Sequence, residues 1–279
     1  MKINKDLAYG ADALQKLDIY EPESDAIADI VLVHGGGWWQ GDKRKEDELA
    51  SALVAANFRV AAINYRLANG ATGENIFPTQ RTDAVTAVKW LVANENFRLD
   101  KLVMWGASSG GNIALEAAQL LATPTVSWSG LNDLAGFMAT HPDVVGKQLI
   151  IGADVKSKDI DQDGENQAYY KWLVDNLTAN GQVPYETATI YDRLTPATKP
   201  VFIANSMTEL VPVGEVATLM NRLITLGVGV ETLVLPGGRH GEGYMADALP
   251  ASISFVIRVL DLRAASCVRH KIHSRLRSH

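Results

Sequence analysis

Hydrophobic and polar residues alternate along this chain with two different periods, and the periods predict strands and helices in regular succession. Leu14, Leu17 and Ile19 stand among polar neighbours and predict a half-exposed first strand over 14–20. The continuous apolar run 30–33 predicts a strand that is buried on both faces. Further strands are expected at 58–65, 102–105, 125–128, 200–204 and 228–235, and helices at 46–56, 80–94, 112–121, 213–226 and 248–262. Strands that alternate with helices predict an α/β fold, with a mostly parallel central sheet and helices on both faces.

Residues 130–193 interrupt this alternation. The stretch is polar and aromatic, with helix-like spacing in pieces such as 168–177. It has too few apolar residues to bury a core of its own, which disfavours a separate domain. We therefore predict a cap inserted over the carboxyl edge of the sheet, where open α/β sheets bind their ligands. Residues 1–262 then form a single domain that carries this cap.

Composition narrows the class of protein. Of the 279 residues, 47% are apolar and 21% charged, as in soluble globular proteins. The chain has no apolar run of 18 residues and no apolar stretch at its N-terminus, so we expect neither a membrane span nor a secretory signal, and a cytoplasmic location. The single cysteine, Cys267, excludes an internal disulfide and a cysteine-built metal site. No metal and no cofactor are expected.

The net charge of −6 is distributed unevenly. The segment 263–279 carries five basic residues and no acidic one, so the remaining chain has a net charge near −11. An acidic body argues against nucleic acid as a partner. The basic segment matches no helix or strand pattern and is predicted to be a disordered tail or a non-native extension, rather than a binding arm.

A serine stands at a sharp turn between a predicted strand and a predicted helix. The motif is Gly106-Ala-Ser108-Ser-Gly110. Such an elbow strains the backbone of the central residue and lifts its hydroxyl clear of the sheet. Strand and helix pass so closely that glycine is needed two residues before and two residues after the serine. The motif alone is weak evidence for a nucleophilic serine, because roughly one chain of this length in ten contains it by chance.

Two further motifs give this serine chemical partners. His240 lies in a glycine-rich loop after the last predicted strand, at the same sheet edge as Ser108, and is the favoured general base over His34 and His141. The rarer motif His34-Gly-Gly-Gly-Trp38 follows the strand 30–33. Its Gly36 and Gly37 N–H groups, with that of Ser109, are suited to stabilise the oxyanion of an acyl-transfer intermediate.

With these motifs the chain resembles the α/β-hydrolases, and within them the hormone-sensitive-lipase-like and BD-FAE-type carboxylesterases. The resemblance spans about 17–262. It rests on His34-Gly-Gly-Gly-Trp38, Tyr65-Arg-Leu67, Trp105-Gly-Ala-Ser-Ser-Gly-Gly111, Leu210-Val-Pro212 and His240-Gly241, in the family's order. It implies the α/β-hydrolase fold and an acyl-enzyme mechanism in which Ser108 is the nucleophile, His240 is the base, and Gly36, Gly37 and Ser109 form the oxyanion hole.

The acid of the triad departs from the family's pattern. Relatives place an aspartate four residues before the proline of the Leu-Val-Pro stretch, and here that position holds Thr208. Threonine cannot stabilise an imidazolium by charge. Glu209, one residue further on, is the favoured acid because its longer side chain can reach. Asp133 is the reserve, with a turn cap as its competing role, and Glu215 and Asp192 are less favoured.

Aromatic residues near the entrance of the expected active site indicate a small apolar or aromatic ester as substrate. The candidate substrate-binding residues are Trp38, Trp39, Trp128 and Tyr244, with Trp172 as a further candidate. The short cap favours short-chain or aryl esters over long triglycerides. Two alternatives stay open: an amide hydrolase resembling the kynurenine formamidases, whose H-G-G-x-W motif the chain also satisfies, and a non-catalytic binding protein on the same scaffold. A homo-oligomer is also compatible with the sequence.

Overall fold

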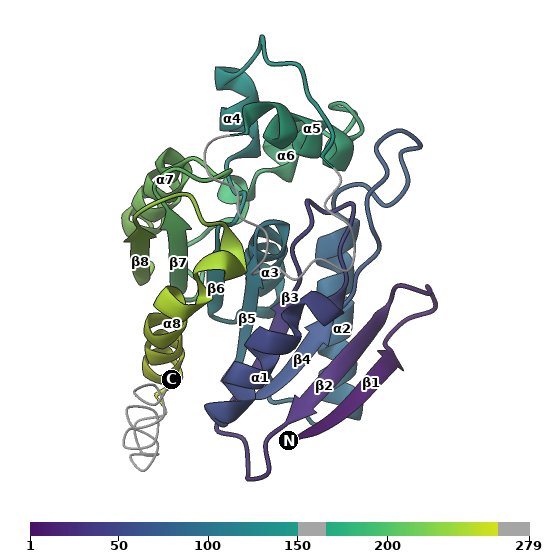
Figure 1. The fold of residues 1–279 in the computed structure, drawn as a ribbon, viewed down its shortest axis with the longest axis vertical. Coiled ribbons are helices and arrows are strands. Elements are labelled where there is room, and N and C mark those ends of the chain that lie inside the picture. The colour runs from purple at the N-terminus through teal and green to yellow at the C-terminus, as the bar shows by residue number, and fades with distance from the viewer. Residues whose placement is uncertain (150–165, 262–279) are drawn as a thin grey trace.

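The computed structural model describes residues 1–149 and 166–261, and these build one eight-stranded sheet in the order β1-β2-β4-β3-β5-β6-β7-β8 (Figure 1). The strands are β1 (Lys2–Ala8), β2 (Lys16–Glu21), β3 (Asp29–Val33), β4 (Arg59–Ile63), β5 (Leu102–Ala107), β6 (Thr125–Trp128), β7 (Val201–Ser206) and β8 (Val230–Leu235). Strand β2 runs antiparallel to both of its neighbours, and every pair from β4 through β8 is parallel. The predicted mostly parallel sheet is confirmed.

Helices cover both faces of the sheet, as predicted. They are α1 (Asp47–Ala55), α2 (Thr79–Asn94), α3 (Ser109–Leu121), α4 (Leu134–Thr140), α5 (Gln167–Thr178), α6 (Tyr185–Ala188), α7 (Val213–Thr225) and α8 (Met245–Val259). Helices α1 and α8 lie on one face of the sheet, and α2, α3 and α7 lie on the other (Figure 1). The buried side chains of α1 and α8 belong to one apolar cluster, and those of α2, α3 and α7 belong to two others. Alternate side chains of the buried strands point to opposite faces of the sheet, and both faces are therefore apolar.

The sequence pattern missed strand β1. This strand pairs only with β2 at the edge of the sheet, and its side chains are mostly exposed. An exposed edge strand needs no regular apolar alternation, because it has no buried face to match. The hydrophobic pattern therefore locates the buried strands and the edge strand β8, expected at 228–235, but not the exposed edge strand β1.

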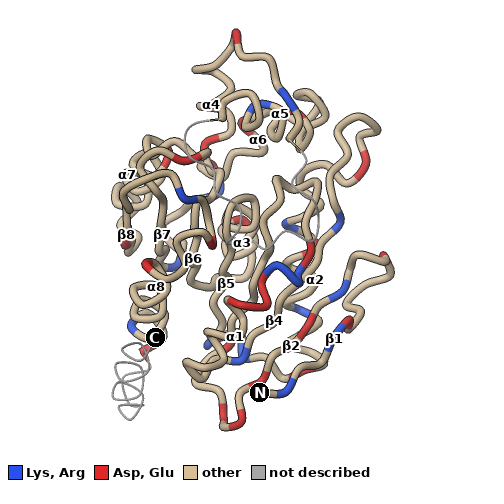
Figure 2. Tube along the Cα trace, in the orientation of Figure 1, with Lys and Arg blue, Asp and Glu red and all other residues tan. Residues whose placement is uncertain are grey.

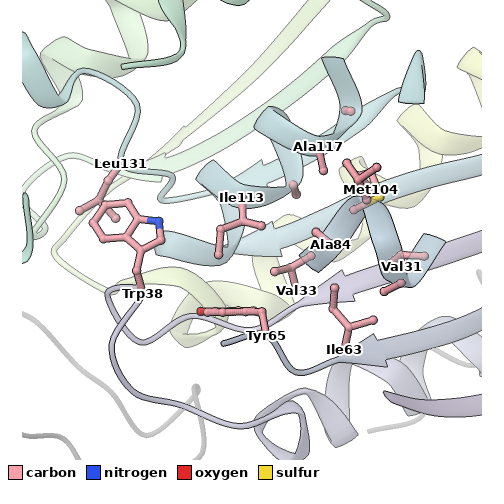
Figure 3. Close-up of a cluster of buried hydrophobic side chains, with 14 of the residues drawn as sticks. Val31, Val33, Trp38, Ile63, Tyr65, Ala84, Met104, Ile113, Ala117 and Leu131 are labelled. Carbon is pink, nitrogen blue, oxygen red and sulfur yellow. The ribbon is translucent and has the colours of Figure 1, made fainter. Parts of the chain in front are cut away.

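Helices α4, α5 and α6 come from the predicted cap and lie beyond the carboxyl ends of the parallel strands (Figure 1). Their apolar side chains belong to the main hydrophobic cluster rather than to a separate one. Figure 3 shows Leu131, Trp38 and Ile113 among the side chains of this cluster. Residues 150–165 of the predicted cap and the basic segment 263–279 lie outside the described residues.

Charged residues of both signs are interspersed along the described chain (Figure 2). A basic run at 43–45 continues directly into an acidic run at 46–48, where the short 3₁₀ helix Lys43–Glu46 leads into α1 (Figure 2). Among the helices of residues 1–149 and 166–261, none combines the length and the apolar character that a membrane crossing requires.

A buried carboxylate joins α7 to the start of the cap. One oxygen of Glu215 accepts hydrogen bonds from the backbone N–H groups of Asn132 (3.2 Å) and Asp133 (3.1 Å). Burial raises the pKa of Glu215 from 4.5 to about 7. The folded state therefore binds this proton more tightly than the unfolded state does, and its stability falls as the pH rises from about 4.5 to 7.

We expect Glu215→Gln to stabilise the protein at alkaline pH. The amide oxygen keeps both backbone hydrogen bonds and carries no buried charge. The gain is at most about 3 kcal/mol above pH 7, or roughly 3–8 °C in Tm, and it disappears near pH 4.5. Thermal unfolding of both proteins between pH 4.5 and 8.5 measures it. A difference in Tm that stays constant across this range contradicts the assignment.

Candidate active site

The serine of the glycine motif lies at a strained turn between β5 and α3. Ser108 has φ 56° and ψ −131°, a conformation that L residues rarely adopt. A Cβ added to Gly106 would lie 2.3 Å from the carbonyl oxygen of Gly110, and one added to Gly110 would lie 2.0 Å from that of Val33. Both glycines are therefore required for the close passage of strand and helix, and the side chain of Ser108 remains partly exposed.

The tri-glycine loop lies directly against this elbow. A Cβ added to Gly35 would lie 3.1 Å from the Cβ of Ser108. Gly36 (φ 126°) and Gly37 (φ 62°) have backbone conformations that favour glycine, and a Cβ on Gly36 would lie 1.9 Å from the carbonyl oxygen of Gln40. Within the described residues, neither N–H group donates a hydrogen bond. Ser109 is the first residue of α3, and N–H groups in the first turn of a helix have no intrahelical hydrogen-bond partner.

His34, at the head of this loop, has a structural role. Its ring is buried, stacks on Tyr65 at a centroid distance of 4.3 Å, and its Nδ1 contacts the carbonyl oxygen of Gly35 at 2.7 Å. Burial lowers the pKa of His34 to about 4, so the ring is neutral at pH 7. The hydroxyl of Tyr65 donates to the carbonyl oxygen of His34 at 3.0 Å, which holds the base of the loop.

His240 and Glu209 form a buried hydrogen-bonded pair. The Nδ1 atom of His240 bonds to Oε2 of Glu209, and both side chains are almost fully buried. A Cβ added to the next residue, Gly241, would lie 3.3 Å from the Cβ of Ala107, the residue before Ser108. The loop of His240 therefore packs against the elbow. In the described structure no hydrogen bond joins Ser108 Oγ to His240, and such bonds often tighten only when substrate is bound.

The second oxygen of Glu209 is held by the protein. Its Oε1 accepts the backbone N–H of Ser206 at 2.9 Å and the hydroxyl of Ser129 at 2.7 Å. Thr208, at the position where the resemblance led us to expect an aspartate, is exposed, and its N–H donates to the carbonyl oxygen of Gly237 at 3.0 Å. Among the carboxylates that the sequence nominated, Glu209 is the one in contact with His240.

The other nominated acids have structural contacts. Asp133 caps α4, because its Oδ1 accepts the N–H of Gly136 at 3.1 Å. Glu215 holds the backbone at the start of the cap, and Asp192 lies in the 3₁₀ helix Ile190–Arg193. Within residues 1–149 and 166–261, none of the three bonds to His240. Asp133, the reserve acid, thus caps a helix in this structure.

Three of the aromatic residues predicted to bind substrate are core residues instead. Trp38, Trp128 and Tyr244 are at most 1% exposed. The indole N–H of Trp128 donates to Ser252 Oγ of α8 at 3.0 Å. A strand directs alternate side chains to opposite faces, and the sequence pattern did not show that Trp128 points into the layer beneath α8.

Trp39 is half-buried and packs edge-to-face against the half-buried Trp172 of α5, with ring centroids 4.9 Å apart. The helix α5 also reaches the tri-glycine loop, since a Cβ added to Gly37 would lie 2.2 Å from a methyl group of Leu173. This pair is therefore the aromatic surface next to the loop. Among the described residues, no group of three His, Cys, Asp or Glu side chains is arranged to hold a metal ion.

Sequence reasoning did not identify Ser129. This serine follows β6 directly and contacts both Glu209 and the loop of His240. The one available signal was its position, a polar residue at the carboxyl end of a buried strand, where ligand-binding residues gather in α/β folds.

Comparison with known proteins adds a family and a fold. A sequence model of the family described as BD-FAE matches residues 17–223. Kynurenine formamidase of Meyerozyma guilliermondii is 30% identical over 118 residues, which are 42% of this chain and 43% of that protein. Versiconal hemiacetal acetate esterase of Aspergillus parasiticus is 32% identical over 119 residues, 42% of this chain and 36% of the esterase. The chain thus spans less than half the length of these relatives.

A solved structure described as a truncated form of a carbohydrate esterase from gut microbiota superimposes with a TM-score of 0.71. The superposition covers 94% of this chain and 97% of that chain, at 17% sequence identity. Likeness at this identity concerns the fold, and it extends over nearly the whole molecule.

Proposed function

Because the chain belongs to the BD-FAE family and has the α/β-hydrolase fold, we propose that it is a serine carboxylesterase that hydrolyses small carboxylic esters through an acyl-enzyme. The observation that carries the proposal is the meeting of three segments at one sheet edge: the strained elbow of Ser108, the buried pair His240–Glu209, and the tri-glycine loop. A nucleophile, an oriented base and backbone donors for an oxyanion are the parts that acyl transfer needs.

In the proposed reaction Ser108 Oγ attacks the ester carbonyl while His240 Nε2 accepts its proton. Glu209 holds the Nδ1–H and stabilises the imidazolium that forms. The N–H groups of Gly36, Gly37 and Ser109 donate to the developing oxyanion. His240 returns the proton to the leaving alcohol. Water then attacks the acyl carbonyl and gives its proton to His240, which passes it to Ser108 Oγ as the carboxylic acid leaves.

The proposed substrates are short-chain or aryl esters. The half-buried side chains of Trp39 and Trp172 offer an aromatic surface next to the tri-glycine loop. The second candidate function is hydrolysis of an aryl formamide. It is favoured by the similarity to a kynurenine formamidase and by the H-G-G-x-W motif at residues 34–38.

A substrate panel tests these functions. We expect turnover of p-nitrophenyl acetate and butyrate, with kcat/KM falling by at least about tenfold from butyrate to palmitate, since a short cap offers little apolar surface to a long acyl chain. N-formylkynurenine tests the second candidate under the same conditions. A higher kcat/KM for the formamide than for every ester makes the protein an amide hydrolase. Absence of turnover throughout the panel favours a binding protein on this scaffold.

A further inference from the structure

We propose that Ser129 is a positioning residue for the triad acid, which fixes the carboxylate of Glu209 and the loop of His240 relative to each other. This inference rests on the proposed function. Ser129 is the residue that follows β6, and its hydroxyl lies between the two segments that the catalytic pair needs to bring together. Its side chain is fully buried, so the contacts form away from solvent.

Three polar groups surround the hydroxyl of Ser129. It donates to Oε1 of Glu209 at 2.7 Å and accepts the N–H of Gly241 at 2.9 Å. The hydroxyl of Tyr244 lies 2.8 Å away and 2.9 Å from the carbonyl oxygen of Ala204. A carboxylate accepts hydrogen bonds and a backbone N–H donates them. The single proton of Ser129 is therefore directed at Glu209. In its contact with Ser129 the hydroxyl of Tyr244 can then only donate, and it shares its one proton between Ser129 Oγ and the carbonyl oxygen of Ala204.

The backbone of Ser129 is held in the position that this contact requires. Its φ of 48° lies in the left-handed region, which is uncommon for serine, and its N–H donates to the carbonyl oxygen of Ala204 at 2.8 Å. Strain of this kind persists where the surrounding structure enforces it, and it gathers at functional sites. Here the turn directs the hydroxyl toward Glu209 instead of continuing the alternation of β6.

A glutamate needs this support more than an aspartate does, because it has one more rotatable bond between backbone and carboxylate. With Ser129 and the N–H of Ser206 both on Oε1, the other oxygen is left to face His240 Nδ1. Removing the hydroxyl leaves Oε1 with one donor and frees the loop at Gly241. The structure therefore predicts a loss in the chemical step rather than in substrate binding.

Ser129→Ala is expected to lower kcat for p-nitrophenyl butyrate by about 10–100-fold, the loss that is typical when a residue that orients a functional side chain is removed. We expect KM to change by less than about twofold. Ser252→Ala is the matched control. Ser252 is an equally buried serine, bonded to Trp128 Nε1 and to the carbonyl oxygen of Ala248, and it does not contact the catalytic pair. We expect this control to keep kcat within about threefold of the wild type.

A double-mutant cycle with Glu209→Gln separates positioning from general destabilisation. If Ser129 acts through Glu209, Ser129→Ala has little further effect once Glu209 is replaced. Additive losses in kcat, or a loss confined to KM, overturn the proposal. A proton NMR measurement gives an answer that does not depend on turnover. The deshielded Nδ1 proton of the His240–Glu209 bond should be present in wild type and Ser252→Ala, absent in Glu209→Gln, and shifted or exchange-broadened in Ser129→Ala.

A spectrum of Ser129→Ala identical to that of the wild type contradicts the positioning role even if the protein hydrolyses esters. Conversely, a wild-type protein that turns over no ester or formamide but shows the expected proton signals rejects the proposed function alone. The two proposals therefore fail by different measurements.

Discussion

Ser108→Ala is expected to lower kcat for p-nitrophenyl acetate and butyrate by about 10⁴–10⁶-fold, since removing the nucleophile of a serine hydrolase leaves only binding and oxyanion stabilisation. The fold should tolerate the change. Alanine has the same Cβ as serine and meets the same backbone strain at φ 56°. Steady-state kinetics measures the loss, and an unchanged Tm shows that it is not caused by unfolding.

A covalent probe makes the same prediction without relying on turnover. A p-nitrophenyl phosphonate should add one adduct to the wild type by intact-protein mass spectrometry and none to Ser108→Ala. The peptide that carries the adduct should contain residue 108. An adduct on another serine, or a variant that keeps ester turnover above about one tenth of the wild type, excludes Ser108 as the nucleophile.

Glu209→Gln is expected to lower kcat by about 10²–10⁴-fold, because a neutral amide neither stabilises the imidazolium nor holds the required tautomer of His240. The amide has nearly the same shape as the carboxylate, so the contact with Ser129 can remain. Kinetics with p-nitrophenyl butyrate measures the effect. Full activity of this variant contradicts the assignment of the acid.

Two further variants test the geometry behind this assignment. Thr208→Asp combined with Glu209→Ala moves a carboxylate to the family's usual position, and we expect no recovery of activity, because residue 208 is exposed and its backbone is tied to Gly237. Asp133→Ala removes the cap of α4 and is expected to cost about 0.5–2 kcal/mol of stability while leaving kcat nearly unchanged. Loss of activity in Asp133→Ala together with its retention in Glu209→Gln makes Asp133 the acid.

The order of elements was accessible from the sequence because it depends on local patterns. Apolar runs marked the buried strands, helical spacing marked the helices between them, and the glycines at 106 and 110 indicated the elbow between β5 and α3. These signals are short-range: each depends on residues that are neighbours along the chain. Strand β1 was not predicted, because an edge strand with exposed side chains has no such pattern.

By itself, then, the amino-acid sequence determined the α/β class, the place of Ser108 at a turn, and a set of candidate carboxylates for the proposed acid. Only the tertiary structure decided that Glu209 meets His240, that Asp133 caps a helix, and that Trp128 and Tyr244 belong to the core. The physical reason is that hydrophobic spacing reports which face of an element is buried. The direction and reach of a side chain at the sheet edge depend on loops brought together from distant parts of the chain, as Ser129 shows by joining β6 to residues 209 and 241.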